Sequence, residues 1–111
     1  MSAPRDDSVY LRHIGDAIDQ VEAYIDGITE EEFLAAPLIQ DGVIRQIQII
    51  GEAAKRLSPK LRSVTLDIPW TDIAGMRDKL VHDYMGVDME TVWYAATRDL
   101  PALRSALRKL L

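Results

Sequence analysis

Apolar residues recur every three or four positions along almost the whole chain, and this spacing is typical of one face of an α-helix. The clearest case is the segment over residues 37–57, whose apolar positions are Val43/Ile44, Ile47, Ile50, Ala53/Ala54 and Leu57. No alternation typical of a β-strand persists beyond a few residues. The periodicity therefore predicts an all-α fold, an antiparallel bundle of about five helices.

Capping residues and helix breakers divide this pattern into segments. We expect helices over residues 8–26, 29–34, 37–57 and 69–84, a connector over residues 60–68, and a C-terminal helical region from residue 88. Ser8 is the expected N-cap of the first helix, and Thr29 with Glu32 forms a capping box for the second. Asp88 can cap the last region, which Pro101 either kinks or divides into two helices.

Length and composition fit one helical domain over residues 1–111, with residues 1–7 as a flexible tail. Hydrophobic residues make up 48% of the chain, enough for a packed core. The absence of cysteine excludes disulfides, zinc–thiolate sites and cysteine nucleophiles, and it is compatible with the reducing cytoplasm, where we expect the protein. No apolar run approaches the roughly 20 residues of a membrane span, so no membrane partner is expected.

The formal net charge is −5, which counts against nucleic-acid binding by electrostatic attraction alone. Basic residues nevertheless gather in two stretches, Lys55, Arg56, Lys60 and Arg62 in the middle of the chain and Arg104, Arg108 and Lys109 at its end. Their simplest interpretation is solvated helix ends, because cations are favourable near a helix C-terminus. A local basic cleft remains open as the alternative.

The helix expected over residues 69–84 carries a charged residue where an apolar one should be. Its apolar face would run through Trp70, Ile73/Ala74, position 77, Leu80/Val81 and Tyr84. Arg77 stands in the middle of that face. A guanidinium cannot lose its proton to escape burial, so it must find a partner, a cleft or a ligand. This conflict between pattern and residue type is where a functional site should be sought.

Residue types and helical spacing suggest how such a site would work. An unperturbed histidine has a pKa of about 6.5, so His82 suits a general acid or base. Asp78 lies one turn away and could orient the imidazole, Arg77 could bind a phosphate, and Tyr84 could donate a hydrogen bond or stack on a base. Arg77 and His82 are about 140° apart around a regular helix. Two copies related by a two-fold axis would surround a substrate better than one.

A structural interpretation of the same residues is also open. Arg77 could extend to solvent and pair with Asp78, Asp83 or Glu52, and Tyr84 could be a core aromatic residue. Glu52 would then be a salt-bridge partner, whereas in a site it would orient Arg77. His13, the other histidine, falls off the apolar face of its helix and is interpreted as a surface residue. Two distant histidines do not make a metal site, so no metal is expected.

At these residues the chain resembles the HEPN superfamily, and within it the HepT-like toxins of MNT–HEPN toxin–antitoxin systems. The family signature R-x-x-x-x-H-x-Y is present as Arg77-Asp78-Lys79-Leu80-Val81-His82-Asp83-Tyr84. Residues 43–58 resemble the long core helix of the family, residues 68–77 the approach to the signature, and residues 92–93 and 99–103 the C-terminal region. The likeness covers roughly residues 8–110.

The resemblance implies a helical homodimer in which Arg77 and His82 of both subunits line the cleft between them. It implies a cofactor-free, metal-independent endoribonuclease that acts as a toxin on an RNA such as tRNA or mRNA. It also implies a partner, a minimal nucleotidyltransferase antitoxin that uses ATP and can transfer AMP onto Tyr84. A bulky anionic group two residues from His82 would block the cleft and repel RNA phosphates.

A second hypothesis of a different class stays beside the first. The chain would be a non-catalytic dimeric helical module whose cleft binds a nucleotidyltransferase partner or a nucleotide. It predicts intact partner binding without RNA cleavage by the pure protein.

Overall fold

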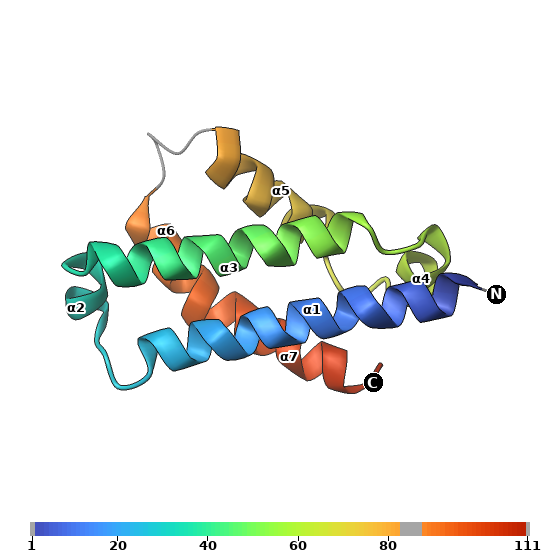
Figure 1. Cartoon of the computed structure of the whole chain (residues 1–111), viewed down its shortest axis with the longest axis horizontal. Helices are drawn as coiled ribbons and strands as arrows, with labels where there is room; N and C mark the ends of the chain where they lie inside the picture. Colours follow the sequence, from blue (N-terminus) through green and yellow to red (C-terminus); the bar gives the residue numbers. More distant parts are fainter. Residues whose placement is uncertain (1, 83–87, 111) are drawn as a thin grey trace.

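The computed structural model describes the backbone of residues 2–82 and 88–110, and the side chains of residues 7–76 and 88–110 (Figure 1). Within these ranges every regular element is helical. The elements are α1 (Ser2–Ile25), α2 (Glu30–Leu34), α3 (Pro37–Lys55), α4 (Pro59–Val64), α5 (Trp70–His82), α6 (Met89–Tyr94), the π-helical turn η2 (Ala95–Asp99) and α7 (Leu100–Arg108). The predicted all-α fold is confirmed. None of the described helices is both long and apolar enough to cross a lipid bilayer.

Helix α3 lies in the middle of the bundle, with α1 on one side and α5 on the other, and both run antiparallel to it (Figure 1). Its apolar face is buried as the spacing predicts, and Val43, Ile47 and Ile50 are at most 2% exposed. Helix α7 packs against α1, and α2 closes one end of α3. Among the residues whose side chains are described, the core is therefore a single cluster built around α3.

Two predicted helix starts are confirmed by their hydrogen bonds. The capping box before α2 is complete, since Thr29 N donates to Glu32 Oε1 over 2.8 Å and Glu32 N donates to Thr29 Oγ1 over 3.1 Å. Asp88 caps α6 by accepting a hydrogen bond from Glu90 N over 2.9 Å. Both caps join residues at most three positions apart, which is why the sequence pattern alone identifies them.

The start of α1 differs from the prediction. The helix begins at Ser2, so it includes most of the stretch assigned to a tail, and Ser8 lies inside it rather than capping it. The reason is a tertiary contact. The carboxylate of Asp7 is buried and accepts hydrogen bonds from Ser58 N over 2.8 Å and from Ser58 Oγ over 2.6 Å. Ser58 in turn caps α4 by accepting a hydrogen bond from Leu61 N.

The connector expected over residues 60–68 contains the short helix α4, which the sequence analysis did not identify. In the C-terminal region, Pro101 lies in the first turn of α7, as the two-helix alternative has it. Helices α6 and α7 are joined without a break by η2, in which Leu100 N donates to Ala95 O across five residues. Since proline lacks an N–H and crowds the preceding turn, a wider turn before it lets the helical path continue.

The basic stretch at the end of the chain does not consist only of solvated residues. Arg104 on α7 donates to Asp19 and to Glu22 of α1, with 3.0 Å between its Nε and Glu22 Oε2. The hydrogen bond with Asp19 is the main reason that the pKa of Arg104 lies above its ordinary value; burial opposes this and Glu22 adds to it. The pairing links α7 to α1 at the surface of the bundle.

We expect Asp7→Ala to lower the free energy of unfolding by about 2–3 kcal/mol, because two donors of Ser58 lose a charged acceptor. Urea unfolding followed by circular dichroism measures the change. Asp16→Ala, an exposed carboxylate on the same helix, should shift stability by less than about 1 kcal/mol. Equal effects of the two substitutions would show that the Asp7–Ser58 contact does not stabilise the N-terminal turn.

Candidate functional site

Helix α5 is regular from Trp70 to His82, so the backbone of Arg77, Asp78 and His82 lies on one continuous helix. In its first half Trp70 is buried and Ile73 and Ala74 are half-buried, whereas the intervening residues Thr71, Asp72 and Gly75 are exposed. Position 77 follows Ile73 by four residues and therefore continues the inward face. The side chains of residues 77–82 and all of Tyr84 lie outside the described residues, so the roles assigned to them remain predictions.

A buried hydrogen-bond chain fixes where α5 begins. The indole Nε1 of Trp70 donates to Thr65 Oγ1 over 2.9 Å, and that hydroxyl donates to Leu61 O in α4 over 2.8 Å. Trp70 and Thr65 are only 4% and 3% exposed. Arg62 of α4 donates to Ala54 O near the end of α3, as expected for a basic residue beside a helix C-terminus. The helix that carries the signature is thus tied through α4 to α3.

Glu52, the predicted supporting residue, lies on α3 and is half-buried. Its Oε1 is 3.7 Å from a terminal nitrogen of Arg56, one turn along the helix. The predicted contact between Glu52 and Arg77 involves a side chain outside the described residues and stays a prediction. Among the described side chains, no group of three His, Asp or Glu is arranged to hold a metal ion.

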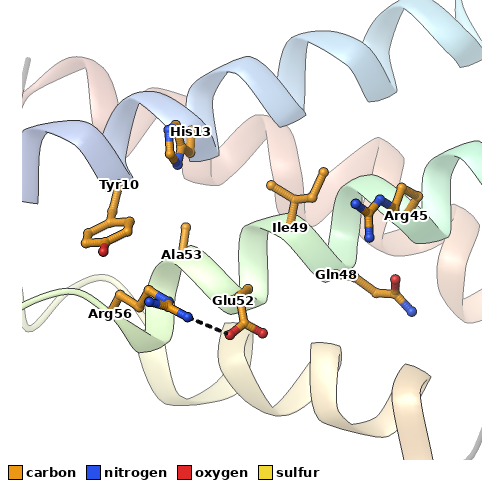
Figure 2. A pocket seen from close by; sticks show the side chains of 8 residues that line it. All are labelled: Tyr10, His13, Arg45, Gln48, Ile49, Glu52, Ala53 and Arg56. Carbon is orange, nitrogen blue, oxygen red and sulfur yellow. Dashed lines mark ion pairs between the residues drawn. The ribbon is translucent and has the colours of Figure 1, made fainter.

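A surface pocket of about 390 Å³ lies between α1 and α3. Figure 2 shows that Tyr10 and His13 approach it from α1, while the remaining lining residues come from α3 and its C-cap, namely Arg45, Gln48, Ile49, Glu52, Ala53 and Arg56. The rings of Tyr10 and His13 meet edge to face, with centroids 6.1 Å apart and planes at 83°. His13 is exposed, as predicted.

The sequence pattern does not reveal this pocket, although three of its residues carry a weak signal. Arg45, Glu52 and Arg56 are spaced by seven and four residues, which places them on one face of α3, away from its buried face. A polar face of this kind is ordinarily solvated, so the pattern alone carries no functional meaning. Only the approach of Tyr10 and His13 from α1 turns the face into a pocket.

We expect Thr65→Val to lower the free energy of unfolding by about 1–3 kcal/mol and to shift the tryptophan emission, because Trp70 Nε1 loses its acceptor in a buried site. Thr65→Ser keeps the hydroxyl and removes one methyl group, so it should cost about 1 kcal/mol and leave the emission unchanged. Denaturant unfolding with fluorescence detection measures both quantities. An unchanged spectrum in Thr65→Val would show that this hydrogen bond does not set the environment of the indole.

Comparison with known proteins gives concordant matches. The family model described as "Ribonuclease HepT-like" matches residues 14–110. A protein of Thermococcus cleftensis, named as a probable ribonuclease HepT, is 40% identical over 101 residues, which cover 91% of this chain and 92% of the relative. A protein of Caldanaerobacter subterraneus, provisionally named as an RNase, is 35% identical over 111 residues, covering 100% of this chain and 96% of the relative.

A third relative shows the same segment within a longer protein. A Methanocaldococcus jannaschii protein, named as a gamma-glutamylcyclotransferase and provisionally as an RNase, is 39% identical over 107 residues. This chain spans 48% of the length of that relative, which in turn covers 96% of this chain. No solved structure matches the chain significantly. The family match covers most of the sequence and includes every residue of the Arg77–Tyr84 signature, and the chain belongs to the HepT-like ribonuclease family.

Proposed function

We propose that this chain is a metal-independent endoribonuclease that acts as a cytoplasmic toxin, with its active site between two copies of the chain. The observation that carries the proposal is the family match over residues 14–110, which includes the whole signature. The ribonuclease names of the relatives support the reaction class. The regular geometry of α5 supports a fixed spacing of Arg77 and His82.

The proposed homodimer follows from that spacing. Five residues along a regular helix separate Arg77 and His82 by about 140° and about 7.5 Å of rise. One helix therefore presents the two side chains to different sides of a substrate. A two-fold axis beside α5 would bring the arginine of one copy and the histidine of the other to one groove.

The chemistry needs only the residues of the signature. The 2′-hydroxyl of the RNA loses its proton to His82 and attacks the adjacent phosphorus, while a second imidazole or a water protonates the leaving 5′-oxygen. Arg77 stabilises the charge that develops on the non-bridging oxygens. Asp78, one turn before His82, orients the imidazole. Glu52 lies on α3, the helix against which α5 packs, and would orient Arg77.

The proposed regulation uses a nucleotidyltransferase antitoxin. The phenol oxygen of Tyr84 attacks the α-phosphorus of ATP, a bond from that oxygen to phosphorus forms, the bond between the α- and β-phosphates breaks, and pyrophosphate leaves. The phenol proton passes to a base of the partner. The added AMP carries a negative charge close to His82, so RNA phosphates are repelled from the groove.

We expect His82→Ala and Arg77→Ala each to reduce RNA cleavage by about a hundredfold or more, since one removes the proton acceptor and the other the phosphate clamp. Purified proteins are incubated with total RNA and with tRNA in the presence of a chelator, and the products are separated by electrophoresis. Arg108→Ala, an exposed arginine on α7, serves as the matched control and should cleave like the wild type.

Unfolding midpoints of the variants should match that of the wild type, which separates loss of chemistry from loss of fold. Cleavage by His82→Ala at the wild-type rate would exclude the proposed mechanism. A wild-type protein that binds its nucleotidyltransferase partner and never cuts RNA would instead support the non-catalytic module.

We expect incubation with ATP and the proposed nucleotidyltransferase antitoxin to add the mass of AMP to the wild type and to suppress its RNA cleavage. Tyr84→Phe should gain no mass, because the phenol oxygen that attacks ATP is missing, whereas Tyr94→Phe, which removes an exposed phenol on α6, should be modified like the wild type. Intact-mass spectrometry measures the addition. Modification of Tyr84→Phe to the same extent would place the AMP on a different residue.

A further inference from the structure

We infer that the pocket between α1 and α3 is a nucleotide subsite, in which Arg45 holds a phosphate of the RNA strand and Tyr10 stacks on a base. This inference rests on the proposed ribonuclease function and adds a part of the substrate site that lies outside the Arg77–Tyr84 signature. It assigns a role to Arg45, which is exposed and takes no part in the core.

The charge at the pocket favours an anion. Arg45 is exposed, and no acceptor among the described side chains pairs with it. Arg56 shares its charge with Glu52 at 3.7 Å, so Arg45 offers the stronger phosphate contact. A guanidinium binds phosphate through two parallel N–H groups. In a chain with a net charge of −5, such a local cation decides where an anionic strand can approach.

The spacing of the two arginines fits a strand rather than an isolated phosphate. Arg45 and Arg56 are eleven residues apart, which is about three turns and about 16 Å along α3. Figure 2 shows them at opposite ends of the lining of the pocket, with Gln48 and Glu52 between them. A single phosphate cannot contact both side chains closely. Different phosphates of one strand can, and a groove that follows the backbone is typical of proteins that bind single strands.

The pocket also has a surface for a base. Tyr10 is half-buried, and the edge-to-face contact with His13 limits how its ring can turn. Ile49 and Ala53 add apolar surface, and the amide of Gln48 offers one donor and one acceptor group to the edge of a base. The volume of about 390 Å³ lies at the lower end of the range of roughly 300–1,000 Å³ typical of small-ligand sites. It suits one nucleotide.

The pocket lies close enough to the signature to serve the same strand. Helix α3 carries five of the eight lining residues and Arg56, its C-cap, is a sixth. Helix α5, which carries Arg77 and His82, packs along α3. A strand whose scissile phosphate lies at α5 would therefore meet the outward face of α3 next. The competing occupant is a side chain from a second copy of the chain.

The test measures RNA binding without cleavage. All variants carry His82→Ala, and the probe is a fluorescein-labelled single-stranded RNA oligonucleotide followed by anisotropy at several salt concentrations. Arg45→Ala should weaken binding about tenfold and lower the slope of log K against log salt by about 0.7. Arg45→Lys should recover most of the affinity, and Arg108→Ala should bind like the parent. Tyr10→Leu should weaken binding about tenfold, while Tyr10→Phe should not.

Two results would overturn the subsite. One is unchanged affinity and salt slope in Arg45→Ala. The other is a change in oligomeric mass, measured by light scattering, with unchanged RNA affinity per dimer, which would assign the pocket to contact between copies. Failure of the ribonuclease proposal can be distinguished from failure of the subsite by measuring cleavage. If the otherwise wild-type protein cuts RNA and Arg45→Ala alone leaves its KM unchanged, only the subsite is wrong. If it cuts no RNA, the ribonuclease proposal is wrong, whatever the binding data show.

Discussion

Burial of the apolar face of α3 between α1 and α5 is the constraint on which the rest of the structure depends. Val43, Ile47 and Ile50 are nearly inaccessible to water, and each side chain of this size contributes about 1.5–3 kcal/mol when fully buried. α1 and α5 flank α3 on either side of its apolar face, and the face turned away from the core is left open and polar. The same packing that builds the core therefore also presents Arg45 and Glu52 at the surface and holds α5 alongside.

The sequence predicts those parts of the fold that depend on local spacing. The start of α3 at Pro37, its buried face and the capping box at Thr29 were all predicted, because periodicity and caps join residues only a few positions apart. The extension of α1 to Ser2 was not predicted, because the partner of Asp7 is Ser58, 51 residues away along the chain. Arg104 was misread for the same reason, since its partners lie on α1.

The candidate site likewise has one part that the sequence predicts and another that it does not. Arg77 is conspicuous in the sequence because it breaks an apolar pattern that α5 otherwise follows through Trp70 and Ile73. The pocket at Arg45 breaks no pattern. Its residues on α3 form an ordinary polar face, and the aromatic side chain that completes it, Tyr10, belongs to a helix more than thirty positions earlier in the sequence. Pattern analysis detects residues that are out of place, whereas a site assembled from well-placed residues becomes visible only in three dimensions.

The acidity of the chain bears directly on how it would select RNA. Its net charge of −5 repels a polyanion over the roughly 10 Å that salt leaves unscreened. Several basic side chains are already engaged within the fold, Arg104 with carboxylates and Arg62 with the carbonyl of Ala54. Attraction then depends on the cations that remain available, and Arg45 is the one of these that lies at the pocket. Under the proposed function and subsite, a strand bound at one such point would gain little, and useful affinity would come from phosphates held at the pocket and at α5 together. Repulsion elsewhere on the surface would thereby make the enzyme selective for RNAs whose shape satisfies both contacts.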